Sequence, residues 1–163
     1  MAVGKWKLDM IVNRSMEIIY SDRPFVLKLI NYLELVYESV RHINPQVLIE
    51  GVEEESRMSW IVGEYMNETV FDRFAILVDQ GREEQMIDDH VDPMMMLMVY
   101  KQTLKSFLFD KPSNYPQVKL EKEFHVFLCK QLRSFFRGLL SKEGTIQFDE
   151  LFEQRAHLVK AYA

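Results

Sequence analysis

The feature that most constrains the fold is a stripe of large apolar side chains at helical spacing between about Val118 and Ser141. Apolar residues that recur three and four positions apart lie along one face of a helix. The stripe is the strongest periodic signal in the chain and consists of Leu120, Phe124, Phe127, Leu128, Leu132, Phe135, Phe136 and Leu139. A long helix with such a face has to bury it against other elements, so this segment predicts a helical core.

Weaker stripes predict further helices. They cover about Lys5 to Tyr20, Pro24 to about Ile43, Glu53 to Gly81, a segment that begins at Asp92, and Ile146 to the C-terminus. Six Gly and five Pro leave few breakers, and no segment alternates convincingly as a strand. The sequence therefore predicts an all-α fold of about six main helices, in one domain over residues 1–163.

Turn and capping residues predict where these helices begin and end. Ser21 to Pro24 offers a capping side chain and a proline suited to a first helical turn, and Asn44-Pro45 stops the second helix. Gly81 is expected to end the third helix, and Gly144-Thr145 to separate the last two.

Charge and cysteine content exclude several classes of protein. A net charge of −5 with scattered basic residues argues against sequence-independent binding to nucleic acid. No apolar run approaches the length that crosses a bilayer. Cys129 has no internal disulfide partner and no apolar signal segment begins the chain, so a cytoplasmic protein is expected.

Methionines crowd the start of the helix that Asp92 caps and Pro93 opens. Methionine is flexible and polarizable, so a wall of such residues adapts to an irregular apolar guest. The first two turns of this helix are apolar all round, which predicts burial all round. Leu97 and Met98 are the expected contribution of this segment to any cavity.

The segment from Asp88 to Asp92 combines three carboxylates with His90, a composition that suits either a divalent metal or a solvated turn. The spacing matches no dedicated metal site, and Asp92 already serves as a helix cap. No catalytic motif is present, because Cys129 has no sequence partner and no Gly-rich phosphate loop occurs. We therefore expect a protein that is not an enzyme.

Two residues are candidates for contact with an anion. His125 borders the long stripe, where it is either a packed core histidine or a polar group at the end of an apolar pocket. Arg73 follows Tyr65 and Thr69 at helical spacing, and either contacts an anion or pairs with a surface acid.

The order of these elements, together with the segment from Ile11 to Tyr20, resembles a family of small sensor-domain proteins of spore-forming bacilli. Those proteins inhibit sporulation and are similar to the sensor domain of a sporulation histidine kinase. The resemblance covers nearly the whole chain and rests on overall pattern. It implies a globin-like bundle without haem, which binds a fatty acid where haem would lie, has halide (chloride) ions nearby, and forms a homodimer. The implied role is to compete with the matching kinase for its signal.

The stripes place such a cavity among apolar residues of three helices. The expected lining is Ile61, Tyr65, Leu97, Met98, Phe124 and Leu128. A carboxylate at its end would need a donor such as His125 or Arg73. Two alternatives stay open: a haem-binding gas or redox sensor that uses His90 or His125, and a helical interaction module without any ligand.

Overall fold

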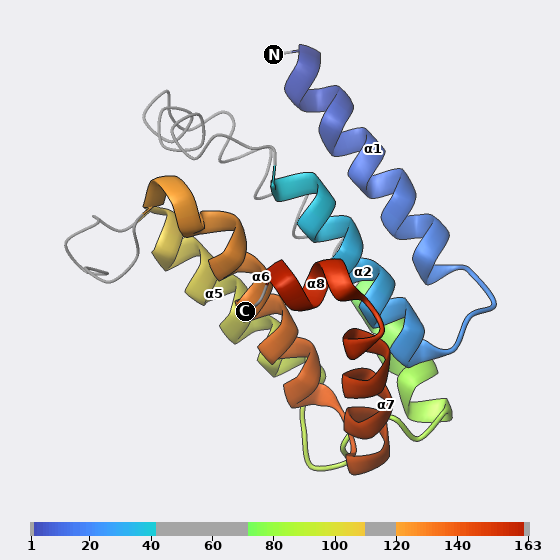
Figure 1. Ribbon diagram of the computed structural model, residues 1–163. Helices are drawn as coiled ribbons and strands as arrows, with labels where there is room; N and C mark the ends of the chain where they lie inside the picture. Colours follow the sequence, from blue (N-terminus) through green and yellow to red (C-terminus); the bar gives the residue numbers. More distant parts are fainter. Residues whose placement is uncertain (1, 42–71, 110–119, 162–163) are drawn as a thin grey trace.

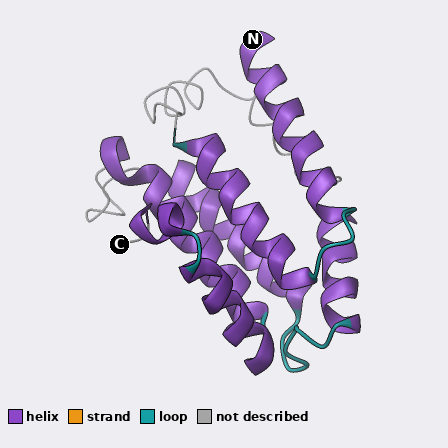
Figure 2. Cartoon of the chain, turned by 45° about the vertical axis from the view of Figure 1, so that its right-hand side comes forward, coloured by secondary structure: helices purple, strands orange, loops and turns teal. Residues whose placement is uncertain are grey.

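The structure is a computed structural model that describes residues 2–41, 72–109 and 120–161 (Figure 1). Its helices are α1 (Ala2–Ile19), α2 (Phe25–Val40), α5 (Pro93–Phe109), α6 (Leu120–Leu139), α7 (Lys142–Glu153) and α8 (Ala156–Ala161), and segment 72–83 is helical as well. The fold is all-α, which confirms the prediction from the stripes. Apart from one isolated bridge between Ile87 and Leu140, the described residues contain no β-structure (Figure 2). None of the described helices is both long and apolar enough to cross a membrane.

Helix α2 lies at the centre of the bundle, where it packs against α1, α6 and α7 (Figure 1). The predicted restart is confirmed, because α1 and α2 run side by side in opposite directions on either side of the turn from Ser21 to Pro24. The predicted capping side chain was wrong, since Pro24 is itself the N-cap residue and no side chain of the turn caps α2. Pro24 takes the position just before the helix, with its φ of −56° already close to helical. Five side chains of α2 are at most 1% exposed: Phe25, Val26, Leu29, Ile30 and Leu33.

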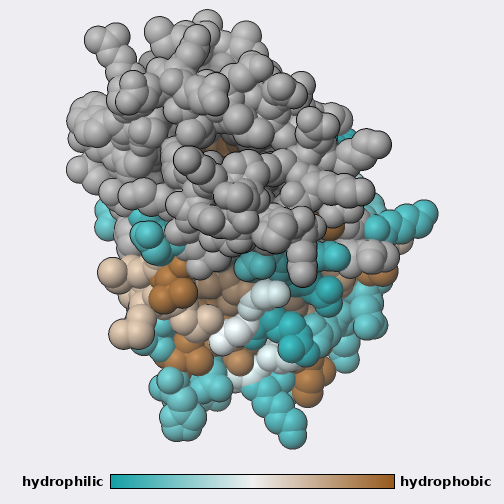
Figure 3. Space-filling view, turned by 90° about the vertical axis from the view of Figure 1, so that its left-hand side faces the viewer, coloured by the Kyte–Doolittle hydropathy of each residue, from teal (hydrophilic) through white to brown (hydrophobic). Residues whose placement is uncertain are grey.

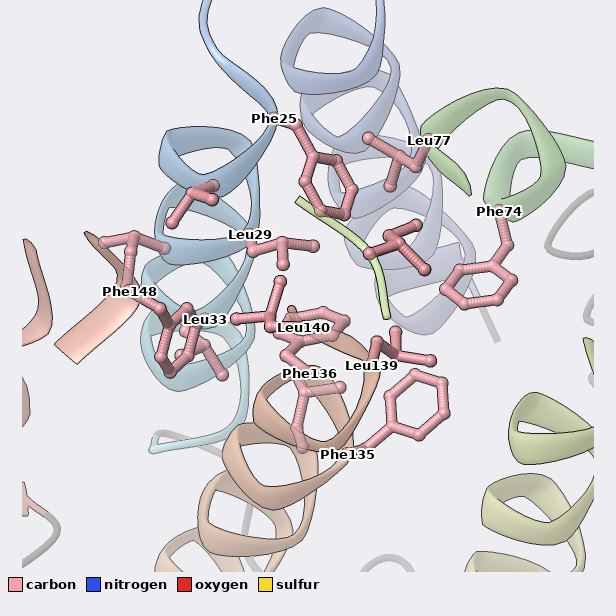
Figure 4. Packing of buried hydrophobic residues seen from close by; sticks show 14 of the residues in the cluster. Phe25, Leu29, Leu33, Phe74, Leu77, Phe135, Phe136, Leu139, Leu140 and Phe148 are labelled. Carbon is pink, nitrogen blue, oxygen red and sulfur yellow. The ribbon is translucent and has the colours of Figure 1, made fainter. Parts of the chain in front are cut away.

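The core joins α2 to segment 72–83 and to the long stripe of α6 (Figure 4). Phe74, Leu77 and Val78 come from the helical segment. Of the predicted α6 stripe, Leu132, Phe135, Phe136 and Leu139 are buried, and Leu128 is half-buried. From α7 and α8 the core takes Phe148, Phe152 and Leu158. The prediction that the α6 stripe faces the core is therefore confirmed for these buried residues.

The connection between segment 72–83 and α5 is pinned to the junction of α6 and α7. Asp88 N–H donates to the Leu139 carbonyl at 2.9 Å, and Ser141 N–H donates to the Met86 carbonyl at 2.8 Å. The Ser141 hydroxyl also donates to the Gln85 carbonyl at 3.1 Å and accepts from Gly144 N–H as the cap of α7. Gln85 turns this connection with a positive φ of 58°. The lower end of the bundle is thus held by backbone hydrogen bonds between distant segments.

Two glycines predicted to break helices instead lie inside them. Gly81 is buried within the helix that continues to residue 83, and Gly144 lies in the first turn of α7. A Cβ at Gly81 would approach the Phe25 ring and Ile87 to 2.8 Å, and one at Gly144 would approach the Met86 carbonyl oxygen to 2.5 Å. The predicted helix ends were wrong because both glycines permit close approach of another segment, which local sequence does not reveal.

The methionine helix begins as predicted but is not buried all round. Asp92 Oδ1 accepts from the N–H groups of Met94 and Met95, each at 3.0 Å, and so caps α5. Leu97 is buried, whereas Met95, Met98 and Val99 are 62–63% exposed. The prediction of complete burial was wrong, because among the described residues the core covers only the side of these turns that carries Leu97.

A buried lysine links the α1–α2 turn to segment 72–83. Lys28 is 3% exposed, and its Nζ donates to the Ile19 carbonyl at 2.7 Å and to Gln80 Oε1 at 2.6 Å. Gln80 Nε2 in turn donates to Glu84 Oε1, and Glu84 Oε2 accepts from Phe25 N–H at 3.0 Å. Burial lowers the pKa of Lys28, and the nearby carboxylates of Glu84 and Asp22 offset part of this effect.

The close approach at Gly144 predicts a large effect of a single methyl group. Gly144→Ala should lower the free energy of unfolding by about 1–3 kcal/mol, because the new Cβ meets a fixed backbone oxygen. Gly138→Ala is the matched control, since its Cβ would meet only the mobile Met96 Cε at 3.1 Å. Gly138→Ala should leave the free energy of unfolding unchanged or raise it by up to about 1 kcal/mol, because alanine has the higher helix propensity. Urea unfolding checks both, and equal stabilities would contradict the close approach.

The lowered pKa of Lys28 predicts a pH dependence of stability. Between the lowered pKa and the ordinary value of 10.5, the unfolded chain binds more protons than the folded protein. The contribution of Lys28 to the free energy of unfolding therefore rises with pH in this window and falls as the pH drops through the lowered pKa. Urea unfolding of wild type and Lys28→Met from neutral pH to 10.5 measures it. The free energy of unfolding of wild type, relative to that of Lys28→Met, should rise toward pH 10.5. If the two proteins show the same pH dependence, the lowered pKa of Lys28 is refuted.

Candidate ligand site

Aromatic rings from α2, segment 72–83, α5 and α6 meet at one place in the core. The Tyr100 ring stacks on Phe135 with centroids 4.8 Å apart and an interplanar angle of 19°. Phe135 contacts Phe74 at 5.7 Å and Phe136 at 5.8 Å, and Phe136 meets the edge of Tyr32 at 6.0 Å. These five residues, called the aromatic cluster below, form one packed set of rings that includes two phenol hydroxyls.

The polar groups of the aromatic cluster are shielded from water. Burial raises the pKa of Tyr100 and of Tyr32 above the ordinary value of 10.0. The nearby thiol of Cys129 and the Tyr32 phenol raise the pKa of Tyr100 further. Both phenols are therefore neutral at physiological pH and can donate a hydrogen bond. Cys129 is 1% exposed, so its thiol is a packing group and not an accessible nucleophile.

Arg73 supplies positive charge beside this cluster. It is half-buried, adjoins Phe74 in sequence, and its charge lowers the pKa of Tyr32, which offsets part of the rise caused by burial. Within the described residues its guanidinium makes one long hydrogen bond, 3.5 Å from Nη1 to the Ser15 hydroxyl. The Ser15 hydroxyl itself donates to the Val12 carbonyl at 2.8 Å. Arg73 thus retains donors that an anion could use.

The structure brings some predicted site residues together and separates another. Leu97 is buried in the core beside Tyr100 on α5, and Leu128 is half-buried one position before Cys129. Met98 is 62% exposed, so its side chain does not share the core with Leu97. Ile61 and Tyr65 lie outside the described residues. The backbone of Phe124 and His125 belongs to α6, but their side chains also lie outside what the structure describes. The cavity stays a prediction.

The acidic turn before α5 holds the candidate metal and haem ligand His90. His90 is exposed, and its N–H donates to Asp88 Oδ1 at 2.8 Å within the turn. In the described ranges, no three His, Cys, Asp or Glu side chains converge as metal ligands would. An open, largely polar depression of about 570 Å³ borders this turn, lined in part by Arg82, Asp89 and Lys142. The exposed His90 does not face an interior between helices, which is the position a haem ligand requires.

Part of the aromatic cluster was not predicted from the sequence. Tyr32 lies three positions after Leu29 and four before Val36, so the stripe of α2 could have included it. Phe74 and Tyr100 were predicted as core residues. Whether Tyr100 lies near Phe74 and its neighbour Arg73 depends on how four elements pack. No protein-family model, curated protein or solved structure matches the chain. The site is therefore interpreted from its own chemistry.

Proposed function

We propose that this protein is a non-enzymatic sensor that binds an amphipathic organic acid, with a fatty acid as the expected type, against the aromatic cluster. One observation carries the proposal: a half-buried guanidinium with a single long hydrogen bond among the described residues lies close enough to the aromatic cluster to lower the pKa of Tyr32. An acid with an apolar tail matches both features. Its tail contacts the rings and its carboxylate pairs with Arg73.

The energetics of an acyl chain suit such a site. Burying each methylene contributes roughly 0.8 kcal/mol, so ten methylenes offer about 8 kcal/mol before the ordering costs of binding. A carboxylate taken out of water needs a charged or hydrogen-bonding partner, or it has to bind protonated. Arg73 provides the charge, and the neutral phenols of Tyr32 and Tyr100 provide further donors. A halide ion would compete for the same guanidinium.

The five residues of the aromatic cluster are apolar rings and neutral phenols, a composition that fits binding better than catalysis. Binding a signal molecule is then the function that these residues support. Competition with a sensor histidine kinase for that signal, which the family resemblance implies, stays a prediction.

The proposal predicts that the carboxylate and the tail are recognised separately. Arg73→Gln should weaken dodecanoate binding by about 10- to 100-fold, the range expected for a lost hydrogen bond to a charged group. Binding of methyl dodecanoate should change little, because the ester carries no charge. Arg82→Gln is the matched control, since Arg82 is an exposed arginine of the same helical segment. Calorimetric titration of both ligands into the three proteins gives the comparison.

Native ligand content tests the proposal independently. Mass spectrometry of lipids extracted from the purified protein should recover a fatty acid, and the same samples should show no Soret absorbance. A Soret band would favour the haem alternative instead. Empty extracts from several expression hosts, together with equal dodecanoate affinity in Arg73→Gln and wild type, would rule the proposed function out.

A further inference from the structure

Two methionines near the start of α5 are open to solvent. Met95 is 63% exposed and Met98 is 62% exposed. They lie three positions apart, which places both thioethers on one side of the helix. Figure 3 views the molecule from the side on which α5 lies in Figure 1, and tan and brown apolar side chains reach the surface there among the described residues. Both methionines are therefore accessible to small solutes.

Three neighbouring methionines are covered instead. Met86, Met94 and Met96 are half-buried and pack against the hydrophobic core. The Met96 methyl carbon lies 3.1 Å from the position that a Cβ at Gly138 would take, so the end of this side chain lies against α6. Helical periodicity thus divides a nearly continuous run of methionines into an open pair and covered neighbours.

A thioether reacts with a peroxide without help from other side chains. The sulfur lone pair attacks one oxygen of hydrogen peroxide, and an S–O bond forms as the O–O bond breaks. The released hydroxide takes the proton of the transferred hydroxyl group, so the products are a sulfoxide and water. The sulfur is oxidised and the peroxide is reduced. Charge separates during this step, and water stabilises the charges better than an apolar surrounding does, so exposed methionines react faster than covered ones.

Oxidation of the open pair leaves the contacts of the fold in place. Asp92 caps α5 through the backbone N–H groups of Met94 and Met95, so the cap involves no thioether. The buried Leu97, which joins α5 to the core, is not altered. A sulfoxide is polar, so each exposed side chain changes from apolar to hydrogen-bonding in water. The same oxygen on Met96 would instead be placed against the core.

We propose that Met95 and Met98 form a reversible oxidation site, at which a peroxide changes the exposed side of α5 from apolar to polar while the core stays packed. Methionine sulfoxide reductases reverse the change: a pair of thiols becomes a disulfide, and the sulfoxide oxygen leaves as water. These enzymes need access to the side chain, and the exposure of both methionines provides it. The inference does not rest on the proposed ligand, because neither methionine belongs to the aromatic cluster.

Peptide mapping of the full chain after brief treatment with hydrogen peroxide tests the proposal. All five methionines lie in one tryptic peptide, residues 83–101, so fragment ions compare them within a single molecule. Met95 and Met98 should be oxidised about tenfold faster than the other three, a factor within the usual cost of placing a polar group in apolar surroundings. In urea, where the fold is lost, all five should react at similar rates. Similar rates in the folded protein, or the same preference in urea, overturn the proposal.

Variants and enzymatic reduction give a second test. The double variant Met95→Leu/Met98→Leu should lose the fast phase of oxidation, whereas the matched control Met86→Leu should keep it. Wild type oxidised only at the open pair should keep the urea midpoint of the untreated protein. The two reductases, one for each sulfoxide epimer, should restore its thioethers in the presence of dithiothreitol. A fast phase that persists in the double variant, a lowered urea midpoint, or sulfoxides that resist both reductases in the folded protein would each refute the site.

Discussion

Burial of α2 is the constraint on which the rest of the structure depends. Five of its side chains are at most 1% exposed, and they span a wide sector of the helix from Phe25 to Leu33. A helix that is apolar over such a sector needs several neighbours to cover it, and α1, α6 and α7 provide that cover. Lys28 lies on the same helix, outside this sector, where its hydrogen bonds tie α2 to the α1–α2 turn and to segment 72–83. The central helix thereby fixes the positions of elements that are far apart in sequence.

Hydrogen bonds at the junction of α6 and α7 then determine where α5 and α6 lie relative to each other. The hydrogen bonds of Met86 and Asp88 to Ser141 and Leu139 place the start of α5 close to the end of α6. Gly144 is required because the first turn of α7 lies against the Met86 carbonyl. Because the start of α5 and the end of α6 are held together in this way, Leu97 and Tyr100 point toward the core. Met95, Met98 and Val99 remain exposed. One placement of one helix therefore decides both which side chains of α5 join the aromatic cluster and which remain exposed.

Sequence predicted those features that depend on neighbours along the chain. The stripe of α6, the cap at Asp92 and the restart after Ser21 were all found, because periodicity and capping are local. The glycines were misinterpreted, since Gly81 and Gly144 owe their presence to Phe25, Ile87 and Met86 in distant segments. Exposure of the methionines could not be predicted either. An apolar helix start looks the same whether it is enclosed by its own chain or left open on one side.

The aromatic cluster shows the same limit for function. Tyr32, Tyr100 and Phe135 come from three elements, and only their packing brings them to Phe74 and its sequence neighbour Arg73. Tyr100 and Val99 are adjacent on α5, and their side chains point about 100° apart around the helix. Tyr100 therefore packs against the core while Val99 is 62% exposed. The pattern along α5 determines which of its residues share a side, but only the packing of α2, segment 72–83 and α6 decides which side becomes the interior.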